Sequence, residues 1–153
     1  MLGGYIHDLD KGDVFKPVSY VLTAFMVSEY AHSLEQNHEF FHSALGPGGR
    51  QVRPPTMIHA DKMRILEENC TKERRIAGQA APDWRVHYEY HAKHHGIAYV
   101  GDTITVSGRI VDKFIRNGRP FLHYYLEART GDGRLITTYN DRTCLRYKRE
   151  GVA

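Results

Sequence analysis

The residues between positions 30 and 60 carry the side chains best suited to chemistry in this sequence. The stretch begins Y-A-H-S-L-E-Q-N-H-E-F-F-H and ends R-P-P-T-M-I-H-A, with a glycine-rich loop in between. A polar, histidine-bearing loop thus follows one predicted helix and precedes a second, which begins after a double proline. The start of a helix presents free backbone N–H groups and the positive end of the helix dipole. The layout predicts a site that can hold a carbonyl oxygen and move protons.

Histidine is the candidate acid–base group of this loop, because its unperturbed pKa lies close to neutral pH. His42 is the first candidate for a general base, and His38 is a further one. Gln36 can form hydrogen bonds but cannot exchange a proton near neutral pH. A carboxylate could come instead from Glu39 or from Glu35. The chain has ten histidines, so an ordinary surface histidine is the alternative interpretation.

The second helix is expected to have its N-cap at Thr56. Backbone N–H groups from Thr56 to Ala60 could then donate hydrogen bonds to an oxyanion. His59 lies on the apolar stripe of this helix, where a buried structural histidine is the alternative. Asp61 falls on the polar side, and a solvated aspartate in the first turn is the simpler interpretation. The expected buried residues are Ile58, His59, Met63, Ile65, Leu66 and Cys70, and the expected solvated ones are Asp61, Lys62, Arg64, Glu67 and Glu68.

A second group of polar side chains lies in the strand predicted at residues 84–92. His87, Glu89 and His91 alternate there with apolar and aromatic residues, and alternate residues of a strand face opposite sides. The aromatic side should be the core, so these three side chains are expected to face solvent or a partner subunit. They have neither a nearby cysteine nor a helical His-x-x-x-His pair, so we expect no metal site.

Length and composition predict one globular domain over residues 1–153. Hydrophobic residues make up 41% of the chain, charged residues make up 25%, and the net charge is +3. There is no block of basic residues to suggest nucleic-acid binding and no apolar run long enough to span a membrane. The first residues lack the features of a signal peptide, so a cytoplasmic protein with two free thiols, Cys70 and Cys144, is expected.

The hydrophobic pattern predicts an α+β protein in which one antiparallel sheet wraps around an apolar helix. A helix capped by Thr23 should stop near Glu35, and the second helix should run from position 56 to position 70. Asn117-Gly118 is a strong hairpin signal. The expected strands are residues 15–22, 84–92, 103–114, 120–128 and 135–147.

This order of elements resembles the hotdog fold. The segments H-Y-E-Y from His87, V-G-D-T-I-T-V-S-G-R from Val100 and R-P-P-T from Arg53 are similar to segments of the MaoC-like acyl dehydratases. The closest resemblance is to the N-terminal dehydratase domains of that family, over about residues 10–148. The family includes (R)-specific enoyl-CoA hydratases and hydroxyacyl-thioester dehydratases. The resemblance implies an enoyl-thioester hydratase or hydroxyacyl-thioester dehydratase.

The resemblance also suggests roles for individual residues. In the family, the aspartate and histidine of a loop similar to G-D-x-N-P-x-x-H activate the water. Laid on this sequence, His42 takes the place of that histidine and Gln36 the place of the aspartate, while His38 and Glu39 take the places of the asparagine and the proline. The backbone N–H that polarises the thioester carbonyl would lie near His59 and Ala60. Arg53, and also Arg50, could contact the phosphates of the carrier.

The implied substrate is a thioester of CoA or of acyl carrier protein, with no further cofactor, no nucleic acid and no membrane as partner. Hotdog domains usually pair, so the chain is expected to form a homodimer or a heterodimer with another hotdog subunit. Because Gln36 replaces an aspartate, a second hypothesis is a non-catalytic acyl-thioester-binding subunit of a heteromeric hydratase. A third is a hotdog thioesterase that uses Asp61 or Glu39.

Overall fold

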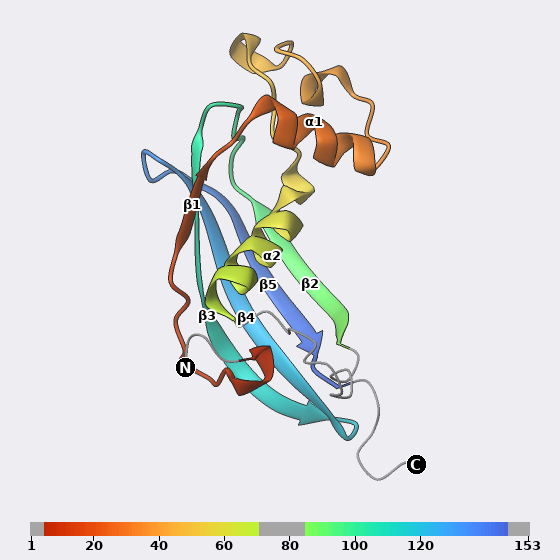
Figure 1. Ribbon diagram of the computed structural model, residues 1–153, viewed down its shortest axis with the longest axis vertical. Helices are drawn as coiled ribbons and strands as arrows, with labels where there is room; N and C mark the ends of the chain where they lie inside the picture. The colour runs from red at the N-terminus through yellow and green to blue at the C-terminus, as the bar shows by residue number, and fades with distance from the viewer. Residues whose placement is uncertain (1–4, 71–84, 147–153) are drawn as a thin grey trace, which may run out of the picture.

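A five-stranded antiparallel sheet forms the body of the protein (Figure 1). The computed structural model describes residues 5–70 and 85–146. The strands lie in the order β1-β3-β4-β5-β2, so β1 and β2 form the two edges. The elements are β1 (Val18–Val21), α1 (Ala24–Ser33), α2 (Ile58–Asn69), β2 (Val86–His94), β3 (Thr103–Arg116), β4 (Arg119–Thr130) and β5 (Leu135–Cys144).

Helix α2 lies across one face of this sheet, as Figure 1 shows. Ile58 and Ile65 of α2 belong to the same buried cluster as Ile110 of β3 and Leu126 of β4. The apolar face of the helix and one face of the sheet therefore form the core together. This arrangement confirms the predicted α+β hotdog architecture.

The hairpin between β3 and β4 turns at Asn117-Gly118, as predicted. Asn117 has φ +52° and Gly118 has φ +72°. Two consecutive residues with positive φ are typical of the tight turns that join antiparallel strands. The sequence signal therefore places this turn correctly.

Helix α1 and the segment after it lie at one end of the sheet, near the start of α2 (Figure 1). The predicted cap is confirmed, because the Thr23 hydroxyl accepts a hydrogen bond from the Met26 backbone N–H at 3.2 Å. The helix buries Val27 and Ala31. Three short 3-10 turns follow before α2, at Glu39–Phe41, Pro47–Gly49 and Pro55–Met57.

The start and the buried face of α2 differ from the prediction. Met57, not Thr56, occupies the N-cap position, and no side chain caps the helix, because a 3-10 turn leads directly into it. Asp61 and Lys62 are buried, whereas Met63 is 53% exposed. The predicted polar side was wrong at these positions, because both charged side chains have partners inside the fold.

Strand β2 contains a bulge that reverses part of the predicted alternation. His87 pairs with Thr143 of β5 and Glu89 with Arg142, so Tyr88 is the extra residue. His87 therefore lies on the face of the sheet that carries Asp141 and contacts this buried carboxylate, although the residue remains exposed. Tyr88 is 54% exposed, so the predicted aromatic core face is broken at this position. Trp84 of the predicted strand lies outside the described residues.

Cys70 and Cys144 are both free thiols, as predicted. In the part of the chain that the structure describes, none of the helices combines the length and the apolar character needed to cross a membrane.

Candidate functional site

A cavity of about 420 Å³ lies where the loop after α1 meets the end of β2 and the start of β5. We call it the loop cavity. Its polar side chains are Gln36 and His38 from the loop, Arg53 before α2, His94 of β2 and Thr137 of β5. The rest of its wall is mostly apolar, and none of the described lining residues is a carboxylate. The combination suits a polar group attached to an apolar chain.

The loop after α1 contributes only two of its five candidate residues to this cavity. Gln36 and His38 line it, whereas Glu35, Glu39 and His42 do not. The Nε2 of His42 lies 2.8 Å from the backbone oxygen of Gln36, so this ring holds the loop in shape. The Nδ1 of His38 accepts a hydrogen bond from the Phe40 backbone N–H at 3.2 Å. Neutral His38 therefore carries its proton on Nε2.

Arg53 forms a buried ion pair at the inner wall of the loop cavity. It is 3% exposed and donates to Asp61, which is 1% exposed. The Tyr20 hydroxyl donates to the other oxygen of Asp61 at 2.5 Å. Burial raises the pKa of Asp61, and the Arg53 guanidinium opposes this shift. Asp61 is therefore a structural partner of Arg53 and has no free oxygen facing solvent.

One nitrogen of Arg53 lacks a hydrogen-bond partner. Its Nε is buried and has no acceptor among the described residues. Arg53 is 3% exposed and lines the loop cavity, so a phosphate bound in that cavity could contact it. Arg50, by contrast, is exposed and lies over the ring of Tyr99 at 3.7 Å.

His94 is a residue of the loop cavity that the sequence analysis did not single out. Its Nδ1 lies 3.2 Å from the Thr137 hydroxyl. Burial lowers the pKa of His94, and the charges of Arg53 and His95 add to this shift. The ring is therefore neutral near pH 7 and can accept a proton. No periodic pattern in the sequence indicates a role for His94, which lies just beyond the end of a predicted strand.

The three residues predicted to bind the thioester carbonyl do not line the loop cavity. Thr56 is exposed, and its backbone oxygen accepts from the Tyr30 hydroxyl at 2.7 Å. His59 and Ala60 are half-buried on α2. The Nδ1 of His59 instead lies 3.2 Å from the Tyr139 hydroxyl, which belongs to a different group of polar residues.

This second group, which we call the inner cluster, lies between α2 and the strands β2 and β5. Its centre is Asp141 of β5, which is 0% exposed. The Asp141 carboxylate contacts several polar groups. Among them are His87 Nε2 at 2.7 Å, Thr143 Oγ1 at 2.7 Å, the Tyr139 hydroxyl at 2.8 Å and Lys62 Nζ at 3.3 Å.

Burial determines the protonation states of His59 and Tyr139 in the inner cluster. Burial lowers the pKa of His59, and the charges of Lys62 and His87 add to this shift. Burial also raises the pKa of Tyr139, and the Asp141 carboxylate adds to this shift. Tyr139 therefore keeps its proton and donates it to Asp141, while neutral His59 can donate to the Tyr139 oxygen.

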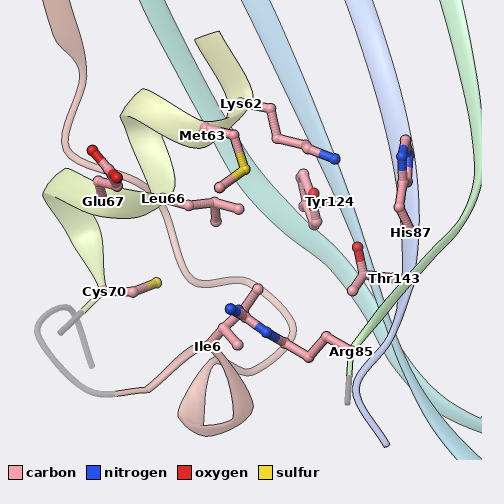
Figure 2. Close-up of a pocket in the computed structure, with 10 residues that line it drawn as sticks. All are labelled: Ile6, Lys62, Met63, Leu66, Glu67, Cys70, Arg85, His87, Tyr124 and Thr143. Carbon is pink, nitrogen blue, oxygen red and sulfur yellow. The ribbon is translucent and has the colours of Figure 1, made fainter. Parts of the chain in front are cut away.

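The inner cluster borders a second cavity of about 340 Å³, which we call the helix cavity (Figure 2). Its polar and charged lining residues are Lys62, Glu67, Arg85, His87, Tyr124 and Thr143, and apolar side chains of α2 complete much of the rest of the wall. This site was not predicted from the sequence, which indicated other roles for His59 and His87. A further signal was the alternation in β5, where Thr137, Tyr139, Asp141 and Thr143 are polar and buried.

The chain matches no family model and no curated protein. Solved structures, however, match most of it. The (R)-hydratase from A. caviae involved in PHA biosynthesis has a TM-score of 0.66 at 15% identity, over 90% of this chain and 98% of its own. The (R)-hydratase PhaJ1 from Pseudomonas aeruginosa has a TM-score of 0.71 at 8% identity, over 93% and 85%. The HadBC (3R)-hydroxyacyl-ACP dehydratase complex from Mycobacterium tuberculosis has a TM-score of 0.68 at 15% identity, over 87% and 95%.

These matches establish the class of fold. The chain has the hotdog fold of the (R)-hydratases and MaoC-like dehydratases, as the resemblance of its sequence segments implied.

Proposed function

We propose that this protein binds an acyl thioester in the loop cavity and acts as an enoyl-thioester hydratase or hydroxyacyl-thioester dehydratase with an altered catalytic loop. One observation carries the proposal. The loop cavity unites Gln36 and His38 with Arg53 and His94, which come from three separate parts of the chain. The hydratases and dehydratases that share the fold support the choice of reaction.

Hydration of an enoyl thioester needs a base for water, an acid for the α carbon and donors for the enolate oxygen. A single neutral histidine can take the proton from water and return it to the α carbon. His38 and His94 are the two groups of the loop cavity that can do this. Gln36 can orient the water through its amide, and the guanidinium of Arg53 can donate to the thioester oxygen.

The carrier in this proposal is CoA or acyl carrier protein. The proposal includes pairing of the chain with a second hotdog subunit, either a copy of itself or a different one. The ChsH1–ChsH2 complex from Mycobacterium tuberculosis, which matches with a TM-score of 0.66 at 14% identity, and HadBC are both complexes. Strand β2 is an edge of the sheet, and an edge strand offers backbone groups to a partner.

A second candidate function is a non-catalytic subunit that binds the acyl thioester beside a catalytic partner. The specific observation in its favour is that none of the described residues lining the loop cavity is a carboxylate. In this case the chain would shape the acyl site, and the partner would supply the acid–base pair.

Hydration of crotonyl-CoA by the purified chain, followed by loss of the enoyl absorbance, tests both candidates. We expect His38→Ala to lower the rate by about 100-fold or more, as for loss of a general base. His32→Ala is the matched control, because His32 is an exposed histidine of α1 that does not line the loop cavity.

The remaining outcomes separate the candidates. An inert native chain that becomes active as Gln36→Asp would support the binding subunit. Activity that survives both His38→Ala and His94→Ala would contradict the placement of the chemistry in the loop cavity.

A further inference from the structure

The helix cavity and the loop cavity are two separate places in the fold. They share no lining residue among those that the structure describes. His87 lines the helix cavity and His94 lines the loop cavity, seven residues apart on the same strand. At a rise of about 3.3 Å per residue, this separation is about 23 Å along the strand. Chemistry at the helix cavity would therefore be independent of the hydratase proposed above.

His87 has the surroundings of a general base. Its Nε2 lies 2.7 Å from the buried Asp141 carboxylate, so in the neutral ring Nε2 carries the proton and donates it to Asp141. The other nitrogen, Nδ1, then has a free lone pair. A carboxylate in this position orients the ring and stabilises the imidazolium that forms when the base takes a proton. The His87 side chain is 35% exposed, and it lines the cavity.

Asp141 is itself held firmly. Thr143 donates to one of its oxygens at 2.7 Å, and Tyr139 donates to the other at 2.8 Å. Because the carboxylate is 0% exposed, water cannot compete for these contacts. The orientation of His87 is therefore set by groups that have little freedom to move.

Lys62 supplies positive charge and N–H donors to the same cavity. An ammonium group has three N–H donors. One of them meets Asp141, with the two atoms 3.3 Å apart. Figure 2 shows the Lys62 side chain extending from α2 toward the strand of His87. Attack by water on a carbonyl needs a base to take the proton of the water and a hydrogen-bond donor to stabilise the oxyanion that forms. His87 and Lys62 supply these two groups.

Part of the wall of the helix cavity is suited to an acyl chain, and the charged residues Glu67 and Arg85 also line the cavity. Ile6, Met63, Leu66 and Cys70 provide apolar walls, and Figure 2 shows the Met63 and Leu66 side chains on the side of α2 that borders the cavity. Burial raises the pKa of Cys70, so its thiol is neutral and acts as a small apolar group.

We propose that the helix cavity hydrolyses an acyl thioester, with His87 as the general base, Lys62 as the oxyanion donor and Asp141 as the residue that positions His87. Water attacks the thioester carbonyl while His87 Nδ1 takes its proton, and the carbonyl oxygen becomes an oxyanion beside Lys62. The C–S bond then breaks, and the leaving thiolate takes the proton from His87. The products are a carboxylic acid and a free thiol. A thiolate is a weak base, with a thiol pKa of about 8.5, so a single histidine suffices.

Release of free thiol from octanoyl-CoA tests this proposal. The saturated chain has no double bond to hydrate, so failure of the hydratase proposal cannot affect the result. We expect His87→Gln, whose amide can still donate to Asp141, to lower kcat/KM by about 100-fold or more. Lys62→Met should lower it as well. His91→Gln on the same strand is the matched control, because His91 does not line the helix cavity, and it should leave hydrolysis unchanged.

Separate values of kcat and KM test whether Asp141 acts by positioning His87. We expect Asp141→Asn to lower kcat and leave KM unchanged, because the acyl chain still fits. If that variant does not fold, Thr143→Val removes one donor to the carboxylate and should produce a smaller loss of kcat. The proposal is overturned if the native chain releases no thiol from acyl-CoA of four to about twelve carbons, or if His87→Gln retains full activity in a folded protein.

Discussion

His87 and Asp141 face each other across two neighbouring strands, with Nε2 and Oδ2 separated by 2.7 Å. The pair exists because the bulge at Tyr88 turns His87 toward the inside of the sheet. It joins α2 to the sheet through Lys62, which contacts the same carboxylate oxygen. The inner cluster is therefore a structural element as well as a proposed catalytic one.

Removal of the Asp141 carboxylate should destabilise the protein strongly. Asp141→Ala leaves Lys62, His87 and Thr143 without their shared acceptor, and breaking a buried ion pair typically costs about 3–5 kcal/mol. Urea denaturation would measure the free energy of unfolding. Asp112→Ala is the control, because that side chain is 47% exposed, and its loss should cost less than about 1 kcal/mol. Equal losses in the two variants would show that the inner cluster contributes no special stability.

The Arg53–Asp61 pair should behave as a coupled unit. Arg53→Met alone leaves a buried carboxylate without its cation, and we expect a loss of about 3–5 kcal/mol. The double variant Arg53→Met with Asp61→Leu should recover a large part of this loss, because no charge then remains buried. A double-mutant cycle by chemical denaturation measures the coupling. Simple additivity of the two single changes would contradict the pairing.

Stability should fall as the pH drops below 6.5. Burial lowers the folded-state pKa of His59 and His94 below the ordinary value of 6.5. The unfolded state therefore binds more protons in this range, so the stability that the neutral rings contribute is complete above pH 6.5 and is lost as the pH falls through their lowered values. Thermal unfolding between pH 8 and pH 5 would show the decline, and the double variant His59→Gln with His94→Gln should flatten it. A curve that is already flat in the native chain would refute the prediction.

Thr23 and Thr56 provide a matched test of helix capping. The Thr23 hydroxyl caps α1, so Thr23→Ala should cost about 1 kcal/mol. Thr56 precedes α2 but does not cap it, and Thr56→Ala should change the stability by less than about 0.5 kcal/mol. Both values can be read from urea denaturation midpoints. A larger loss of unfolding free energy for Thr56→Ala than for Thr23→Ala would contradict the statement that Thr56 does not cap α2.

Local sequence signals determined the main elements of this fold. The Thr23 cap, the apolar stripe of α1, the Asn117-Gly118 turn and the alternation in β3 and β4 each depend on residues close together in the chain. Patterns of this kind predict helices and strands because the backbone periods of 3.6 and 2 are local properties. Their order, with the short segments similar to MaoC-like dehydratases, was enough to predict the hotdog fold.

The tertiary structure alone decided which polar side chains meet. Lys62 and Asp141 are 79 residues apart, and each has the appearance of a solvated charge until the fold brings them together. One bulge at Tyr88 reversed the predicted direction of His87, because a strand pattern assumes an unbroken period of two. The choice between His38 and His42 likewise depends on an irregular loop whose backbone has no period. Contacts between distant residues and breaks in regular geometry leave little local trace, and the two cavities are built from both.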